Sequence, residues 1–279
     1  MKTMWRSNVG IPAPVPSFLR KMPCKSNKIR RKFALLCGKM LYLRNKTRQY
    51  TEHPIPYMPL IRHLTIVFDT PIHRAEIPFL RGAVIASMPR DASLFHGHDG
   101  EGLRYAYPLI QYKCIRRKAA LFSLGEGTEA LWDYFRNCTP QVRLGNRRAV
   151  LTVEHIEAAE TDVEVTETME SYRVEHWLPF NEDNFARYES EESLVARVQM
   201  LERILTGNIL SMLKGLGIRT ERQIELQIVA VERKGMERYK SVGLMSFDIT
   251  FRCNVVMPAH IGLGRHVSTG FGTVSRLSR

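Results

Sequence analysis

The order of the apolar patterns between residues 60 and 156 constrains the fold of this chain more than any other feature. Strand, helix, strand, strand, helix and strand patterns occupy, in turn, residues 60–68, 75–88, 107–114, 119–124, 126–137 and 149–156. Strand patterns are distinguished from helical ones by β-branched content and by the spacing of apolar residues. The resulting βαββαβ order is the split βαβ arrangement of a ferredoxin-like domain.

The second half repeats this theme less regularly, so we expect an α+β protein with two ferredoxin-like units in tandem, at residues 58–160 and 161–279. Its strands are predicted at residues 170–178, 224–231, 244–255 and 273–277. A long helix is expected to begin with Ser190 as its N-cap and to stop at Gly215 and Gly217. Its buried face is predicted to consist of Leu194, Val198, Leu201, Leu205, Leu210 and Leu213.

The first 57 residues differ from the rest and are left out of the fold prediction. Residues 1–53 hold 13 Lys and Arg against one acidic residue, in a protein whose net charge is +13. Such a composition predicts a disordered basic extension. A basic arm that touches RNA, a targeting segment and upstream sequence from an early start codon all remain open. We favour the last, because Met58 stands just before the first clear strand.

Neither a membrane span nor a disulfide framework is predicted. The sequence has no apolar run near the roughly 20 residues that a bilayer-spanning helix needs. Its five cysteines include no Cys-x-x-Cys pair. An odd and scattered set of cysteines is typical of a reducing compartment, so we expect a cytoplasmic protein.

A glycine stretch at residues 262–272 is the first candidate functional segment. Gly262 and Gly264 precede, and Gly270 and Gly272 follow, an insert at residues 265–269. Backbone N–H groups in such a stretch can bind an anion, because glycine permits close approach. The sequence matches neither a dinucleotide fingerprint nor a P-loop. A tight turn between two C-terminal strands is the alternative interpretation.

A histidine loop at residues 95–108 is the second candidate segment. His96 and His98 lie two residues apart among several glycines. Histidine titrates near neutral pH and therefore suits proton transfer. Three interpretations remain open: two surface histidines, a His-x-His metal site, and acid–base chemistry on a polyanion that the glycine stretch holds. The residues following His98 do not continue the metal-hydrolase pattern.

The two segments together resemble a known family. The resemblance is carried by four stretches: residues 79–84, the FHGHD motif, residues 105–113 and the closing Gly-x-Gly-x5-Gly-Phe-Gly motif. Through them the sequence resembles CRISPR-associated endoribonucleases that cut the repeats of precursor CRISPR RNA, in the subgroup found with type I-B systems. The resemblance covers residues 58–279. It implies that His96, His98 and Tyr105 are catalytic, and that neither a metal nor a cofactor takes part. Some relatives use a lysine instead, for which Lys113 and Arg104 are the candidates.

The resemblance also implies the partners of the protein: precursor CRISPR repeat RNA, the mature crRNA and, as an open question, other effector-complex subunits or a second copy in a homodimer. Predicted RNA contacts are Gly262, Gly264, Arg265, His266, Ser268, Gly270, Gly272, Arg104, Lys113, Arg116, Arg117 and Lys118. The implied reaction is attack of a 2′-hydroxyl on its own phosphate. A non-catalytic RNA-binding subunit and a metal-dependent phosphoesterase are the alternatives.

Overall fold

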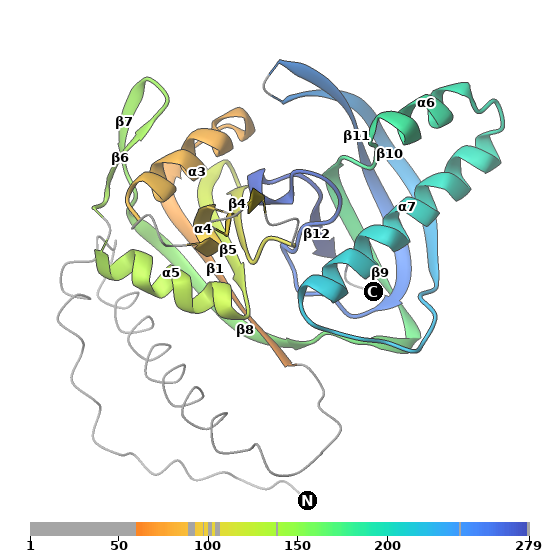
Figure 1. Ribbon diagram of the computed structural model, residues 1–279, viewed down its shortest axis with the longest axis horizontal. Coiled ribbons are helices and arrows are strands. Elements are labelled where there is room, and N and C mark those ends of the chain that lie inside the picture. The colour runs from red at the N-terminus through yellow and green to blue at the C-terminus, as the bar shows by residue number, and fades with distance from the viewer. Residues whose placement is uncertain are drawn as a thin grey trace, which may run out of the picture.

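The computed structural model describes residues 60–277 apart from 89–92, 97, 100–101, 104–106, 138 and 240 (Figure 1). The predicted extension of residues 1–57 lies outside the described residues. So do two predicted site residues, Arg104 and Tyr105. The backbone of His96 and His98 is described, but their side chains are not.

The first unit is a four-stranded antiparallel sheet with two helices on one face. Its strand order is β4-β5-β1-β8, which is the order of a ferredoxin-like sheet and confirms the predicted fold class. The strands are β1 (Leu60–Pro71), β4 (Ile110–Ile115), β5 (Lys118–Leu124) and β8 (Val153–Asp162). The helices are α3 (Ile77–Ala86), which follows the 3-10 turn η1 (Arg74–Glu76), and α5 (Glu126–Asn137).

Both helices form where their apolar spacing predicts, and α5 has the predicted bounds. In α3, Pro78 lies in the first turn, where its missing N–H leaves no intrahelical bond unmade. Ile77, Leu80 and Val84 are fully buried beneath it. These residues pack on the apolar face of the sheet together with the side chains of α5.

The prediction of one strand at residues 149–156 is wrong, because the chain turns a corner within this range. Its first two residues belong to β7 (Arg147–Val150), which pairs with β6 (Gln141–Leu144) in a separate hairpin. Leu151 and Thr152 belong to neither strand, and the last four residues open β8, which pairs with β1. Apolar and β-branched residues continue through the corner, so the change of hydrogen-bonding partner leaves no mark on the sequence pattern.

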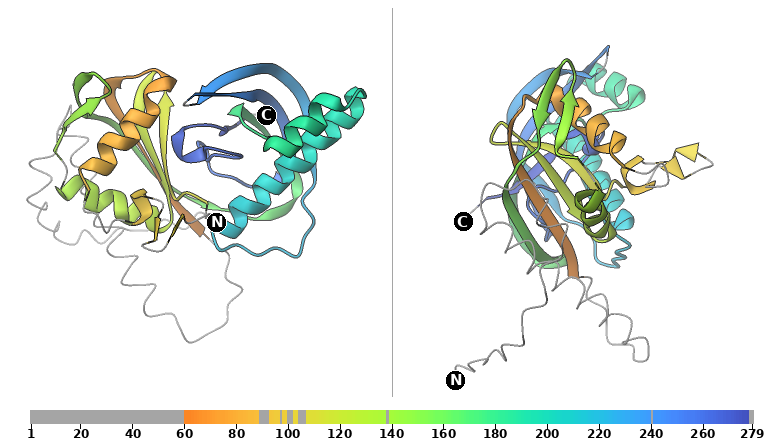
Figure 2. Two further views of the ribbon diagram at one scale, coloured as in Figure 1. Left: turned by 45° about the horizontal axis from the view of Figure 1, so that its top comes forward. Right: turned by 90° about the vertical axis from the view of Figure 1, so that its left-hand side faces the viewer.

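The second unit repeats the strand order of the first. Its sheet has the order β10-β11-β9-β12 and lies beside the first sheet (Figures 1 and 2). The strands are β9 (Val165–Trp177), β10 (Leu226–Tyr239), β11 (Val242–Val255) and β12 (Thr273–Arg276). Between β11 and β12, where the first unit has α5, this unit has the glycine stretch with a 3-10 turn, η2 (Val267–Thr269).

The helical part of the second unit corrects two details of the prediction. Ser190 ends a short helix, α6 (Glu182–Ser190), and Ser193 instead caps α7 (Leu194–Gly215), accepting a hydrogen bond of 3.3 Å from the backbone N of Ala196. The first turn of α7 extends past the sheet, so Leu194 is 74% exposed. Leu210 is also exposed, because the buried stripe passes instead through Leu201, Leu205, Ile209, Met212 and Leu213.

The outer strand of the second sheet, β10, carries two irregularities. Its register against β11 shifts between Ile228 and Ala230 and again between Val231 and Arg233. Each shift leaves one extra residue, Val229 and then Glu232, which is the pattern of a β-bulge. Among the described residues, no helix is long and apolar enough to cross a membrane.

Candidate functional site

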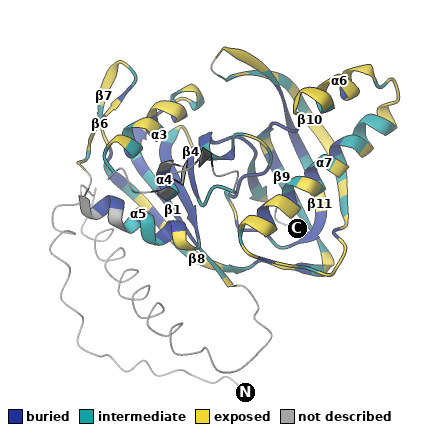
Figure 3. Ribbon diagram, viewed as in Figure 1, coloured by how far each residue is buried: buried dark blue, intermediate teal, exposed yellow. Residues whose placement is uncertain are grey.

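The glycine stretch lies between the two units and is hydrogen-bonded to both (Figures 1 and 2). From the first unit, the Tyr107 hydroxyl donates to the carbonyl of Gly262 at 2.7 Å and Arg74 donates to that of Gly270 at 3.3 Å. Toward the second unit, the backbone N of Arg265 donates to the carbonyl of Leu178 at 3.2 Å. The stretch is therefore part of the interface between the units, and much of it is buried (Figure 3).

The four glycines stand where the protein itself leaves no room for a side chain. A β-carbon at Gly264 would lie 2.7 Å from Cδ1 of Trp177, and one at Gly270 would lie 2.6 Å from Cδ1 of Ile77. Both glycines also have a positive φ, of 92° and 85°. At Gly262 and Gly272, a β-carbon would collide with other residues of the stretch. Intramolecular packing thus explains the glycine spacing without any RNA contact.

The insert between the glycines carries the polar groups that reach the surface. Arg265 is exposed, and its guanidinium donates to the carbonyl of Phe180 at 2.8 Å. His266 has a left-handed φ of 56° and stacks on Tyr239 with ring centroids 4.1 Å apart. Ser268 is partly exposed. The far end of β10 therefore meets the glycine stretch at His266.

Two residues that the sequence did not single out complete this surface. Tyr239 ends β10, and its ring also makes an edge contact with Phe271. Arg74 lies over the Phe271 ring, 5.2 Å from its centroid, in cation–π geometry. The sequence indicates only weakly that Tyr239 and Arg74 belong to the site, because a tyrosine at a hairpin end and an arginine before a helix are common. The structure brings them together from segments over 160 positions apart in the printed sequence.

Lys113 lies beneath the glycine stretch and not on the surface. The residue is 1% exposed, and its amine donates to the Thr273 hydroxyl at 3.1 Å. Burial, and then the nearby Arg74 guanidinium, lower the pKa of Lys113 to about 7. Burial, followed by Lys113, also lowers the pKa of His260. An amine so covered cannot reach RNA, so we no longer count Lys113 among the RNA contacts.

The basic turn between β4 and β5 stays on the surface. Arg116 and Arg117 are both exposed and both have positive φ, 50° and 61°. Lys118, which follows them, forms an ion pair with Glu154 at 2.6 Å. The turn therefore presents two guanidinium groups, while the lysine next to them is already paired with a carboxylate.

In the histidine loop, the structure describes no side chain from residue 96 to residue 106, but it describes the backbone of three short elements there. These are α4 (Ser93–His96), β2 (His98–Asp99) and β3 (Gly102–Leu103). His98 pairs with Leu103 in the two-residue ladder, and the ladder projects from the body in the right-hand view of Figure 2. The catalytic roles of His96, His98 and Tyr105 stay predictions, since the groups that would act lie outside the described residues.

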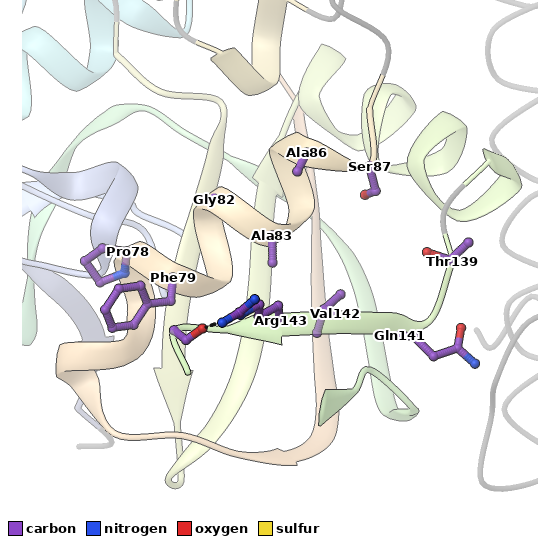
Figure 4. Close-up of a pocket in the computed structure, with 11 residues that line it drawn as sticks. Pro78, Phe79, Gly82, Ala83, Ala86, Ser87, Thr139, Gln141, Val142 and Arg143 are labelled. Atoms are coloured by element: carbon purple, nitrogen blue, oxygen red, sulfur yellow. Dashed lines mark hydrogen bonds between the residues drawn. The ribbon is translucent and has the colours of Figure 1, made fainter. Parts of the chain in front are cut away.

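A groove of about 520 Å³ lies elsewhere, between α3 and β6 (Figure 4). Its walls include Phe79, Gly82 and Ala83 on the helix and Val142 and Arg143 on the strand. The guanidinium of Arg143 donates to the Gly145 carbonyl at 3.0 Å. Among the described residues that line the groove there is no carboxylate or histidine, so these residues offer no acid–base pair. Within the part of the chain that the structure describes, no group of three or more His, Cys, Asp or Glu could hold a metal.

Comparison with solved structures supports the fold. A crystal structure of a Cas6b protein is 25% identical, with a TM-score of 0.72, over 78% of this chain and 100% of that one. A crystal structure of a CRISPR RNA processing endoribonuclease, Cas6b, is 24% identical with a TM-score of 0.62, again over 78% of this chain and 100% of that one. At that identity, the second likeness bears on the fold alone.

Comparison of sequences identifies the family. An uncharacterized protein of Methanocaldococcus jannaschii is 36% identical over 115 residues, which are 40% of this chain and 76% of the relative. The Cas6b N-terminal domain model matches residues 60–162 and the Cas6b C-terminal domain model matches residues 164–277. Since the two domain models match in order and together span both sheets, the chain belongs to the Cas6b family.

Proposed function

We propose that this protein is a metal-independent endoribonuclease that cuts precursor CRISPR RNA within its repeats and so produces mature crRNA. The observation that carries the proposal is the match of both Cas6b domain models across residues 60–277. A solved structure of similar fold is a CRISPR RNA processing endoribonuclease. We further propose that the two units divide between β8 and β9, just after the predicted boundary at residue 160, with the histidine loop in the first and the glycine stretch in the second.

The proposed reaction is an internal transesterification. The ribose 2′-oxygen attacks the adjacent phosphorus and loses its proton, and the 5′-oxygen leaves and gains one. The products are a 2′,3′-cyclic phosphate and a 5′-hydroxyl end. His96 and His98 would move the two protons, a contribution that is typically worth about 10²–10⁴-fold in rate. Tyr105 would hold the scissile phosphate.

The RNA contacts that we propose are the groups that the structure leaves at the surface. They are Arg265, His266 and Ser268 of the insert, with Arg116 and Arg117 of the basic turn. A guanidinium suits phosphate oxygens, because its donors form a fixed fork. Such contacts position RNA without reading its sequence, as expected where shape governs recognition of a hairpin. The buried glycines would shape this surface and need not touch RNA.

The deciding experiment is cleavage of a labelled repeat RNA in EDTA, beside the same RNA with a 2′-deoxy sugar just 5′ of the cut. We expect cutting of the normal RNA in EDTA and binding without cutting of the deoxy RNA. Binding of the normal RNA without any cutting would instead support a non-catalytic RNA-binding subunit. Cutting that needs an added divalent ion would support a metal-dependent phosphoesterase.

A further inference from the structure

Strand β4 connects the two candidate segments. It begins directly after the histidine loop and runs beneath the glycine stretch. Just before the strand begins, the Tyr107 hydroxyl donates to the carbonyl of Gly262 at 2.7 Å. Near its far end, Lys113 donates to the Thr273 hydroxyl at 3.1 Å, and that hydroxyl donates to the carbonyl of Gly270 at 3.3 Å. Both ends of the glycine stretch are thus linked by hydrogen bonds to residues 107–113, the segment that follows the two histidines in the chain.

The surroundings leave these bonds little freedom. Gly215, at the end of α7, packs so tightly on Tyr107 that a β-carbon at residue 215 would collide with the tyrosine side chain. A β-carbon at Gly270 would meet both Ile77 and, at 3.0 Å, the Tyr112 carbonyl oxygen. The glycine stretch consequently sits on β4 in one position, which the hydrogen bonds define and the packing maintains.

A lysine at position 113 is not explained by stability. Placing an amine in a buried site costs free energy that a hydrophobic side chain of similar length would avoid. Within the described part of the chain, the amine of Lys113 donates its hydrogen bond to the Thr273 hydroxyl. The lowered pKa of Lys113, to about 7, reflects the same unfavourable burial. A role in the reaction would account for the presence of a residue whose burial destabilises the folded state.

We propose that Lys113 is a positioning residue for RNA cleavage: through Thr273 and Gly270 it fixes the glycine stretch on β4, the strand that follows the histidine loop in the chain. The proposal rests on the function proposed above. Because the amine is covered, Lys113 acts on the reaction only through the position of other groups. A displacement of about 1 Å between a bound phosphate and its acid–base groups can cost ~10²-fold in rate.

The test compares cleavage rate with RNA affinity in single-turnover reactions. Lys113→Met removes the amine and keeps the length of the side chain. We expect a rate constant ~10–100-fold lower at saturating RNA, with a dissociation constant within about threefold of wild type. Lys234→Met, at an exposed lysine that pairs with Glu189, is the matched control and should cut at the wild-type rate.

Variants at Thr273 test the hydrogen bonds themselves. Thr273→Val should slow cleavage as Lys113→Met does, whereas Thr273→Ser keeps the hydroxyl and should restore the rate. The double variant Lys113→Met/Thr273→Val should be no slower than Lys113→Met, because the two residues act in one series of bonds.

Three results would overturn the proposal: a wild-type rate in folded Lys113→Met, equal losses of rate and affinity, or multiplicative losses in the double variant. If Lys113→Met does not fold, the Thr273→Val and Thr273→Ser pair decides, and equal rates for the two would overturn the proposal. If the wild-type protein binds the repeat RNA but never cuts it, both the proposed function and this inference are refuted. Wild-type cleavage alongside an unaffected Lys113→Met refutes the inference alone.

Discussion

Replacing Gly264 by alanine should destabilise the protein strongly, even though the change adds one methyl group. The new β-carbon would lie 2.7 Å from Cδ1 and 2.8 Å from Nε1 of Trp177, and 3.0 Å from the Leu178 carbonyl oxygen. The indole cannot move aside freely, because it is fully buried and its Nε1 donates to Asn208 at 2.9 Å. The φ of 92° adds backbone strain, since side chains rarely adopt it.

The magnitude follows from these two terms. Strain at a sparsely populated backbone conformation costs about 1–3 kcal/mol, and overpacking a filled site costs about 1–3 kcal/mol. We therefore expect Gly264→Ala to lower the free energy of unfolding by about 2–6 kcal/mol. Urea unfolding followed by far-UV circular dichroism would measure the loss.

Gly207→Ala is the matched control for this experiment. Gly207 lies on the exposed side of α7, and a β-carbon there would have nothing within 4 Å. Removing a glycine from a helix interior should stabilise the protein by about 0.5–1 kcal/mol. A Gly264→Ala protein that unfolds at the wild-type urea concentration would refute the packing argument. It would restore close approach to RNA as the reason for this glycine.

Four further outcomes are expected. Arg265→Ala should weaken RNA binding across sequences and reduce the salt slope of log K by about 1, as measured by titration at several salt concentrations; an unchanged slope would mean no phosphate contact. His98→Ala should slow cleavage by about 10²–10⁴-fold with binding kept, and a wild-type rate would remove His98 from the mechanism. The pKa of Lys113 is lowered to about 7, so the folded state binds fewer protons than the unfolded state above that pH. The stability of wild type relative to Lys113→Met should thus rise with pH from 7 toward the ordinary lysine value, by at most about 1.4 kcal/mol per pH unit; a flat difference in urea unfolding would contradict the lowered pKa. Ser193→Ala should cost about 1 kcal/mol by removing the N-cap of α7, whereas Ser190→Ala should cost less, and equal losses would contradict the assigned cap.

Local patterns were sufficient to predict the strand order of the first unit and the bounds of α5. They failed where two elements share one pattern, as at the corner between β7 and β8. They also failed where two elements divide a helical region, since Ser190 and Ser193 are equally suited to cap a helix and tertiary packing selects the second.

The site was harder to predict, because its contacts join remote segments. Lys113 and Thr273 are 160 positions apart, and Tyr107 and Gly262 are 155 apart. In a strand pattern, a lysine at position 113 looks like a solvent-facing residue. The second unit covers that face of the sheet, which no window around residue 113 reveals. The sequence-based prediction therefore assigned to RNA a cation that the fold buries.

The two bulges of β10 bear on how copies of the protein meet. An outer strand of 14 residues with exposed Val229, Val231 and Met236 would ordinarily invite another chain to extend the sheet. Each bulge interrupts the even row of N–H and C=O groups that such pairing needs. The longest uninterrupted part, Arg233–Tyr239, carries four charged side chains, and charged side chains on an edge strand oppose pairing with another chain. Concentrated protein should therefore resist sheet-to-sheet aggregation along this edge, and a dimer, where one forms, should use another surface.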